Sequence, residues 1–186
     1  MAEYESIHGT RVRYLSSDPT LNTSTEGQVW YNSTEGTLKS LVQIKAWSAG
    51  GALNTAIRQA AGAGTQTAGL KAGGQTGSSN TTEEYNGFNW SPGGNLGTGR
   101  SLLAGAGTQT AGLVFGGNNG SNIGNTEEYN GSTWSEQNDL SVARRNLAGA
   151  GVQTAGLAFG GFVDSPSGAS VDNTEEYDGT SWTAGG

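Results

Sequence analysis

The sequence contains three pairs of adjacent glutamates, Glu83–Glu84, Glu127–Glu128 and Glu175–Glu176. Two carboxyl groups can serve as the acid and the base of glycoside hydrolysis. However, neighbouring residues of a β-strand point to opposite faces of the sheet, and an enzyme has little use for three equivalent copies of one catalytic pair. We therefore predict a structural role, in which one glutamate of each pair faces solvent and the other pairs with an arginine from the first strand of its repeat. The arginines available for this role are Arg58, Arg100, Arg144 and Arg145.

Few other residues are candidates for chemistry. His8 is the only histidine and no cysteine is present, so neither a recognisable nucleophilic triad nor a thiolate metal site is expected. The loops GGNNGSNIGN and FVDSPSGASVD are rich in polar side chains but do not have the fixed spacing of a calcium loop. We expect no catalytic residue, no metal and no cofactor.

The glutamate pairs recur because the chain is a repeat from Trp47 onward. Gly64, Gly107 and Gly151 follow one another at intervals of 43 and 44 residues. A tryptophan also recurs in this frame, and the interval from Trp134 to Trp182 is longer than the earlier ones because it contains the long loop FVDSPSGASVD. Stacked repeats tolerate such insertions. Trp47 lies 17 residues before Gly64, as later tryptophans lie before their next glycines, so we predict that it closes an incomplete leading unit. The tryptophans of this frame are Trp47, Trp90, Trp134 and Trp182.

Each copy divides into four short strand-like segments separated by glycine, asparagine and serine. In the middle copy these segments are RSLLAGAG, TQTAGLVFGG, NTEEYNG and STWSE. Four strands in every 40 to 50 residues or so are typical of a β-propeller blade. We predict an all-β fold of four-stranded blades over a repeat region of residues 47–186. The copies span approximately residues 57–90, 100–134 and 144–182.

An apolar strand that ends in two glycines, followed by Tyr-Asn/Asp-Gly and then tryptophan, resembles the kelch motif. The resemblance covers about three quarters of the chain and implies kelch-like propeller blades. A double glycine permits positive φ and close approach of a neighbouring backbone, and the aromatic residues supply area for packing blade on blade. Lys71 and Ala72 depart from the later copies, which have Val-Phe or Ala-Phe there. The motif residues are Gly73, Gly74, Tyr85 and Trp90; Gly116, Gly117, Tyr129 and Trp134; and Gly160, Gly161, Tyr177 and Trp182.

The number of copies leaves the larger architecture open. Propellers typically have four to eight blades, whereas this sequence offers three copies and a fragment, which make an incomplete or open propeller. The sequence is then a piece of a longer protein, or blades from several chains associate, or the units stack in an open arrangement. We favour the first alternative.

Residues 1–46 do not repeat and are predicted to form an attachment arm that contains a β-hairpin. Residues 29–31 are apolar, the following NSTEG supplies a turn with Gly36, and residues 37–44 partly alternate. The segment GQVWYNSTEGTLK at residues 27–39 resembles segments that recur in tail-fibre and other virion proteins of bacteriophages. The resemblance implies a virion protein that is assembled in the host cytoplasm.

Composition limits both the core and the partners. With 33 glycines and only 33% hydrophobic residues, the core is expected to be thin, distributed and aromatic. A formal net charge of −7, with no basic cluster beyond Arg144 and Arg145, argues against electrostatic binding to nucleic acid or to anionic lipid. The sequence contains no apolar run long enough for a signal peptide or a membrane span. We expect no nucleic-acid partner and no membrane insertion.

The loops at residues 116–125 and 161–173 differ most between copies. Loops on a rigid scaffold usually carry binding, and the serine, asparagine and glycine content of these two suits hydrogen bonding to glycans. The alternative is that they vary because nothing constrains them. The candidate ligand-binding residues are Asn118, Asn119, Ser121, Asn122, Phe162, Asp164 and Ser165.

These observations predict a structural protein of a bacteriophage virion that works by binding and not by catalysis. Its N-terminal segment attaches to other virion proteins, and its repeats serve assembly or bind a glycan or protein of the host surface, in an oligomeric arrangement. Two alternatives stay open. A carbohydrate-active propeller enzyme would need carboxylates at non-equivalent positions, and a cellular kelch adaptor would need an accompanying dimerisation or ligase-adaptor domain.

Overall fold

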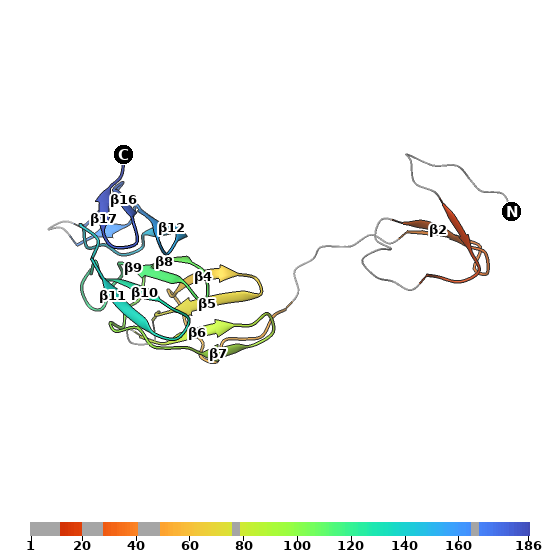
Figure 1. Ribbon diagram of the computed structural model, residues 1–186, viewed down its shortest axis with the longest axis horizontal. Helices are drawn as coiled ribbons and strands as arrows, with labels where there is room; N and C mark the ends of the chain where they lie inside the picture. Colours follow the sequence, from red (N-terminus) through yellow and green to blue (C-terminus); the bar gives the residue numbers. More distant parts are fainter. Residues whose placement is uncertain (1–11, 20–27, 41–48, 76–78, 165–167) are drawn as a thin grey trace. The chain divides into compact units, whose positions relative to one another are not determined.

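The computed structural model describes residues 12–19, 28–40, 49–75, 79–164 and 168–186 (Figure 1). The chain divides into two compact units, Met1–Ala49 and Gly50–Gly186. The described residues form β-strands and no helix, so the predicted all-β class is confirmed. Within this part of the chain, no helix is long and apolar enough to cross a membrane.

The N-terminal unit contains a three-stranded sheet of β1 (Arg13–Leu15), β2 (Val29–Asn32) and β3 (Thr37–Ser40). Strands β2 and β3 form the predicted hairpin, and Gly36 in its turn has a φ of 68°. Strand β1 pairs with β2 in parallel. The sequence analysis did not predict this third strand, because a three-residue strand followed by a long connection has no local signal.

Asp18, in the segment that follows β1, holds that segment against the hairpin. Its carboxylate accepts hydrogen bonds from Trp30 Nε1 at 2.9 Å and from Asn32 Nδ2 at 2.8 Å, and it pairs with Lys39 Nζ at 2.6 Å. These donors, the lysine first, lower the pKa of Asp18 to about 2. One carboxylate thus ties all three parts of the small sheet together.

The second unit consists of three four-stranded antiparallel sheets, each built from strands in chain order. Sheet 1 comprises β4 (Ala61–Thr65), β5 (Ala68–Ala72), β6 (Thr82–Tyr85) and β7 (Trp90–Pro92). Sheet 2 comprises β8 (Ala104–Gly107), β9 (Gly112–Phe115), β10 (Thr126–Tyr129) and β11 (Trp134–Gln137). Sheet 3 comprises β12 (Ala148–Val152), β13 (Ala155–Phe159), β16 (Thr174–Tyr177) and β17 (Trp182–Ala184). The four-strand periodicity predicted from the spacing is therefore present, and the described strands form no closed barrel or propeller.

The long loop of sheet 3 contains an additional small hairpin. Strand β14 (Phe162–Val163) pairs with β15 (Ala169–Ser170). The sequence analysis assigned this stretch to a variable loop without strands. The predicted closing strand at Trp47 and the arm residue His8 lie outside the described residues.

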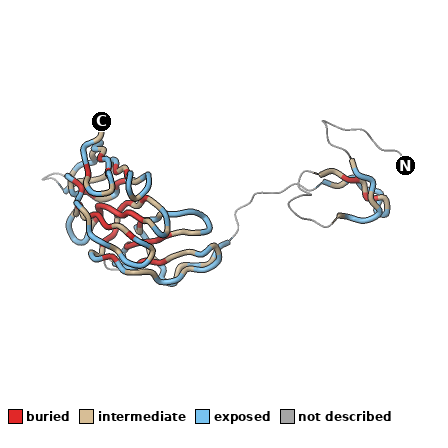
Figure 2. Tube along the Cα trace, in the orientation of Figure 1, coloured by how far each residue is buried: buried red, intermediate tan, exposed pale blue. Residues whose placement is uncertain are grey.

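The core lies between successive sheets, as the buried positions in Figure 2 show. The first strands of the three sheets, β4, β8 and β12, lie next to one another. A Cβ at Gly105 would come 2.9 Å from the Gly62 carbonyl oxygen, so glycine permits this close approach. The cluster between sheets 1 and 2 consists of Ala61, Ala72, Leu96, Leu103 and Val114, with Trp134 packed against it. The cluster between sheets 2 and 3 consists of Ala104, Ala106, Leu113, Phe115, Leu140, Leu147, Ala158, Tyr177 and Trp182.

The double glycine after each second strand is used at the sheet-to-sheet boundary. Gly73 and Gly74 have φ values of 65° and 117°, which side-chain-bearing residues rarely adopt. The Gly74 N–H donates to the Arg100 carbonyl oxygen of the next repeat at 2.9 Å, and Gly117 donates in the same way to Arg144. The pair thus turns the chain and binds the following repeat. The third pair, Gly160 and Gly161, has the same conformation, with φ values of 65° and 111°.

Candidate functional site

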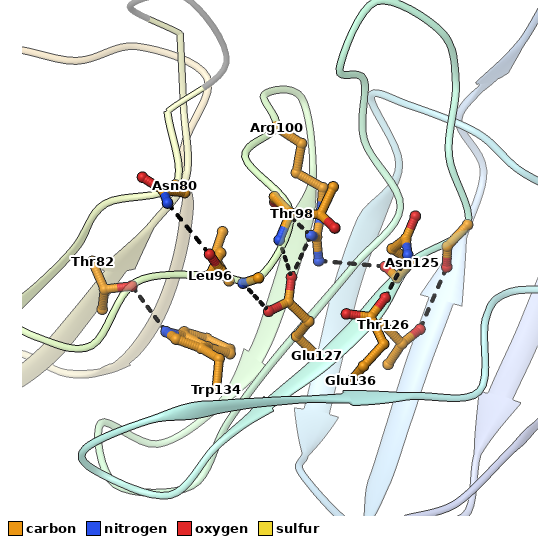
Figure 3. A network of polar contacts seen from close by, with 12 residues as sticks. Asn80, Thr82, Leu96, Thr98, Arg100, Asn125, Thr126, Glu127, Trp134 and Glu136 are labelled. Carbon is orange, nitrogen blue, oxygen red and sulfur yellow. Dashed lines mark hydrogen bonds and ion pairs between the residues drawn. The ribbon is translucent and has the colours of Figure 1, made fainter.

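The first glutamate of the middle pair, Glu127, lies in a buried polar network of its own repeat (Figure 3). Its carboxylate accepts from Arg100 Nη1 at 2.6 Å and from the backbone N–H of Gly97 at 2.7 Å. Thr98 N–H donates at 3.3 Å to Oε1, the oxygen that also accepts from Arg100, whereas Gly97 donates to Oε2. The side chains of Arg100 and Glu127 are 0% and 1% exposed. This carboxylate is fully engaged in holding the loop before β8 onto β10.

Glu175 takes the same place in the third repeat. Its carboxylate lies 3.0 Å from Arg144 Nη1 and accepts a hydrogen bond from Ser141 N–H at 2.8 Å. The arginine and glutamate are close but not aligned as a hydrogen bond, so their attraction is that of an ion pair. Burial lowers the pKa of Arg144, and the Glu175 carboxylate opposes that shift. The predicted glutamate–arginine pairing is thus found in the second and third repeats.

The first repeat departs from this arrangement. Ile57 occupies the arginine position, because its side chain packs on Gly74 as Arg100 packs on Gly117. Lys71 lies opposite buried Glu83 on the paired strand, where the later repeats have an apolar residue, and its Nζ donates to Thr81 Oγ1 at 2.8 Å. Burial lowers the pKa of Lys71, and Glu83 opposes that shift. The lysine that departs from the motif therefore supplies the positive charge that the isoleucine cannot.

Two of the four arginines named from the sequence do not pair with the repeated glutamates. Arg58 is exposed and donates to Gln75 Oε1 at 3.1 Å. Arg145 pairs with Asp164 at 2.6 Å. Glu83 accepts instead from the backbone N–H and the side-chain amide of Asn54, both at 2.8 Å. The prediction was wrong for the first repeat because Ile57 occupies the arginine position and Arg58 lies one residue later, at the position that Arg145 has in the third repeat.

The second glutamate of each pair does not simply face solvent, which corrects the prediction. Glu84 Oε1 accepts the hydroxyl of Tyr129, in the next sheet, at 2.5 Å, and Glu128 accepts that of Tyr177 at 3.0 Å. Burial and this carboxylate raise the pKa of Tyr129 to about 12. The same causes raise the pKa of Tyr177. Of the three second glutamates only Glu176 is exposed, and no sheet follows its own among the described residues.

The motif tyrosines and tryptophans form one ring pair in each sheet, with centroids 4.8 to 5.1 Å apart. Trp134 Nε1 donates to Thr82 Oγ1 of the preceding sheet at 2.9 Å (Figure 3), and Trp182 donates to Thr126 at the same distance. Tryptophan thus connects each sheet to the one before it.

A repeated glutamine makes a second link of this kind, which the sequence analysis missed although the residue recurs in the frame. Gln109 Nε2 donates to the carbonyl oxygens of Gly69 and Tyr85 at 3.0 and 2.8 Å. Gln153 makes the same pair of bonds to Gly112 and Tyr129 at 3.0 and 2.9 Å. The recurrence of Gln-Thr-Ala-Gly-Leu was the available signal.

The predicted loop residues gather in part around Arg145. Its guanidinium lies 2.6 Å from both Asn122 Oδ1 and Asp164 Oδ1, and 4.7 Å from the ring centre of Phe162. Asn122 Nδ2 in turn donates to the Phe162 carbonyl oxygen at 2.9 Å. We call Arg145, Asn122, Phe162 and Asp164 the Arg145 cluster. It joins the variable loops of the second and third repeats.

The other predicted loop residues are peripheral. Asn118 is half-buried, and its amide donates to Asn122 Oδ1 at 3.3 Å. Asn119 and Ser121 are exposed in a tight turn, in which Asn119 N–H donates to the Ser121 carbonyl oxygen. Ser165 lies outside the described residues. Arg145, at the centre of the cluster, was named from the sequence only as a partner for glutamate.

Over the described residues, no three histidine, cysteine, aspartate or glutamate side chains are grouped as a metal site requires. No family model matches the chain, and no curated protein is significantly similar to it. The interpretation of function therefore depends on the geometry of the repeats and of the Arg145 cluster.

Proposed function

We propose that this chain is a structural protein of a bacteriophage virion, with kelch-like propeller blades as its repeats and with binding, not catalysis, as its role. We choose binding over catalysis because the repeated carboxylates are engaged in structural contacts. Five of the six glutamates hold loops or neighbouring sheets through the contacts described above. Hydrolysis of a glycosidic bond needs two carboxyl groups that face one substrate, about 5 to 9.5 Å apart. The paired glutamates serve the scaffold instead.

The kelch-like interpretation is supported by the roles of the motif residues. The double glycines of the first two repeats, and the tyrosines and tryptophans of the last two, lie at sheet-to-sheet boundaries, which is where blade packing places them. A propeller blade is a four-stranded antiparallel sheet in chain order. All three sheets of this unit have that topology.

Attachment through the N-terminal unit is supported by its hairpin and by the sequence resemblance to phage fibre segments. Residues 29–40 form the strand–turn–strand unit, and Asp18 holds it to the preceding strand. A small self-contained sheet ahead of the repeats suits a segment that docks onto another virion protein.

Mass spectrometry and immunogold electron microscopy of purified particles test the proposal. The chain should be present in stoichiometric amounts in the virion, with the N-terminal unit closer to the particle than the repeats. Particles purified to homogeneity that lack the chain would refute a virion role.

The Arg145 cluster favours a second element of this function, recognition of a host-surface glycan. Arginine beside an aromatic ring and an amide offers donors and a stacking face at one surface, and the guanidinium carries five N–H groups of which few are used here. A glycan array and a host-cell adsorption assay with the wild-type chain and Arg145→Ala test this. Arg58→Ala is the matched control, because Arg58 is also an exposed arginine but lies away from the cluster. If neither array nor cells bind the wild-type chain, the repeats are architectural only.

The two alternative functions predict different results. A carbohydrate-active enzyme would shorten host polysaccharide during incubation with the chain. A cellular kelch adaptor would be absent from particles and would retain a defined protein partner.

A further inference from the structure

The hydrogen bonds between sheets 1 and 2 recur at equivalent positions between sheets 2 and 3. The later sheet supplies a tyrosine hydroxyl, a tryptophan Nε1 and a glutamine amide, and the earlier sheet supplies a glutamate, a threonine and two carbonyl oxygens. The later sheet also presents glycines, against which the earlier sheet packs its leucine. The donors of the two boundaries are Tyr129, Trp134 and Gln109, and Tyr177, Trp182 and Gln153.

Sheet 3 displays the acceptor side of this boundary without a following sheet among the described residues. Phe159 is 39% exposed, although its equivalent Phe115 is 0% exposed and meets the ring of Trp182. Leu157 is half-buried where Leu113 is fully buried, and Glu176 is exposed where Glu128 binds a tyrosine. We call this surface the acceptor face.

Sheet 1 displays the donor side without a preceding sheet among the described residues. Gln66 is exposed, whereas its equivalents Gln109 and Gln153 each bridge two carbonyl oxygens of the neighbouring sheet. Tyr85 and Trp90 occupy the positions of the other two donors, and neither donates a side-chain hydrogen bond to the described residues. We call this surface the donor face.

Two glycines of the donor face have space that their equivalents lack. A Cβ at Gly62 would meet nothing closer than 3.9 Å, but at Gly105 it would lie 2.9 Å from a carbonyl oxygen of the preceding sheet. A Cβ at Gly69 would have only ordinary contacts from 3.4 Å, but at Gly112 it would lie 2.5 Å from Leu70 Cδ2. Within one copy, therefore, nothing requires glycine at residues 62 and 69.

We propose that the acceptor face of one copy of this chain binds the donor face of a second copy, head to tail, with the same contacts as the two internal boundaries. Gln66 then reaches the carbonyl oxygens of Gly156 and Tyr177, and the Tyr85 hydroxyl reaches Glu176. Trp90 Nε1 reaches Thr174 Oγ1. Leu157 packs on Gly69, and Phe159 packs beside Gly62.

Two copies are needed to close a ring of sheets. A head-to-tail interface produces a ring when the rotation between units closes, and propellers have about four to eight blades. The described residues of one copy supply three four-stranded sheets, so two copies supply six, whereas three copies would exceed the range. The docking contacts go beyond the proposed function and stand without it, but closure at two copies rests on the propeller architecture proposed above.

One local rearrangement accompanies docking. Gly50 lies beside the Tyr85 hydroxyl as Gly93 lies beside that of Tyr129, because a Cβ would come 2.8 and 2.7 Å from these oxygens. In the docked pair, Gly185 of the first copy arrives at the place that Gly50 of the second copy occupies. Both glycines belong to an Ala-Gly-Gly sequence. On docking, one of these two segments moves aside and the other contacts the Tyr85 hydroxyl.

Light scattering and analytical ultracentrifugation of the full chain over a concentration series test the proposal. The expected particle has twice the 18.9 kDa mass of one chain. A monomer at every concentration overturns the docking, and open assemblies that grow with concentration overturn closure at two copies.

The glycine positions supply the decisive variant, Gly62→Ala with Gly69→Ala in the full chain. Each added methyl group fits the isolated sheet but overlaps the docked copy, so dimer dissociation should become easier by about tenfold or more. The circular dichroism spectrum and the thermal unfolding of diluted monomer should not change. Dimerisation equal to that of the wild type would overturn the proposal and would mean that these glycines are only copies of the neighbouring repeats.

Phe88→Ala is the matched control. Phe88 is 78% exposed in the β6–β7 turn of the same sheet, and its side chain makes none of the hydrogen bonds that repeat between the sheets. The head-to-tail contact predicts no change in dimerisation for this variant. Loss of the dimer on removal of Phe88 would show association through an exposed aromatic residue and would overturn the proposal.

Discussion

Arg100 Nη1 lies 2.6 Å from Glu127 Oε1, and neither side chain is more than 1% exposed. The arginine comes from the loop before β8 and the glutamate from β10, so the pair holds the start of a sheet to its third strand. Buried ion pairs of this kind are costly to break because the remaining charge stays without compensation. The same relationship recurs at Arg144 and Glu175.

Removing one member of this pair should destabilise the repeat unit strongly. We expect Arg100→Met to lower the free energy of unfolding by about 3–5 kcal/mol, because Glu127 would remain buried without its cation. The double variant Arg100→Met with Glu127→Gln should cost less, since the charge is removed while a side-chain oxygen still accepts from Gly97. Urea unfolding measures both. Arg58→Ala is the control and should lie within about 0.5 kcal/mol of the wild type because its side chain is exposed.

The first repeat should accept the charge arrangement of the second. Lys71→Val alone should destabilise because Glu83 loses its neighbouring cation. Adding Ile57→Arg should restore much of the loss, because an arginine at the equivalent position packs on the double glycine and reaches the glutamate. A double-mutant cycle should give a favourable coupling of about 0.5–3 kcal/mol. If the effects of the two substitutions on the free energy of unfolding simply add, a cation at residue 57 does not replace the one at residue 71.

The tyrosine–glutamate links should make the fold sensitive to alkali. The folded state raises the pKa of Tyr129 to about 12, and it raises that of Tyr177 as well. A raised pKa means that the neutral hydroxyl is the form that stabilises the fold. Its contribution is complete below the ordinary tyrosine pKa of 10.0 and is lost as the pH rises through the pKa of the folded state. Thermal unfolding between about pH 9 and 12 should show this loss.

Tyr129→Phe with Tyr177→Phe should flatten the alkaline dependence while lowering stability at neutral pH, because two hydrogen bonds to carboxylates are removed. An unchanged alkaline slope in this variant would assign the sensitivity to other groups.

The N-terminal unit should be sensitive to acid instead. Hydrogen bonds from Lys39, Trp30 and Asn32 lower the pKa of Asp18 to about 2 from 3.8. The stabilisation is therefore present above pH 3.8 and is lost as the pH falls through about 2. The indole N–H resonance of Trp30 should move with this midpoint in an NMR titration. In Asp18→Asn that transition should disappear, and its persistence would show that a different carboxyl group is responsible.

Several features could be predicted from the sequence because their signals are local. The spacing of glycine, tyrosine and tryptophan predicts three four-stranded units, and Gly36 predicts the hairpin turn, since strand alternation and turn conformation depend on neighbouring residues. The first strands β4, β8 and β12 lie next to one another, and the small side chains of Ala-Gly-Ala-Gly allow this close packing. The glycine pairs were likewise predicted to allow close backbone approach.

Other features depend on which distant residues meet, and no local pattern encodes that. The sequence does not reveal that Lys71 supplies the positive charge that Ile57 lacks. Lys71 and Glu83 are distant in sequence and become neighbours only when their strands pair. The prediction that one glutamate of each pair faces solvent was wrong for Glu84 and Glu128, since their tyrosine partners belong to the next sheet, 45 and 49 residues away.

The repeat itself, its strand order and its turns thus follow from residue types at fixed short intervals. Side-chain alternation determines the strands, and the conformational freedom of glycine determines the turns. The partners of its charges follow from packing between sheets. Burial demands a partner for each of Glu83, Glu127 and Glu175, but only the assembled tertiary structure determines whether that partner is an arginine, a lysine or a backbone N–H. The same holds for Arg145, whose cluster exists because two loops from different repeats lie side by side.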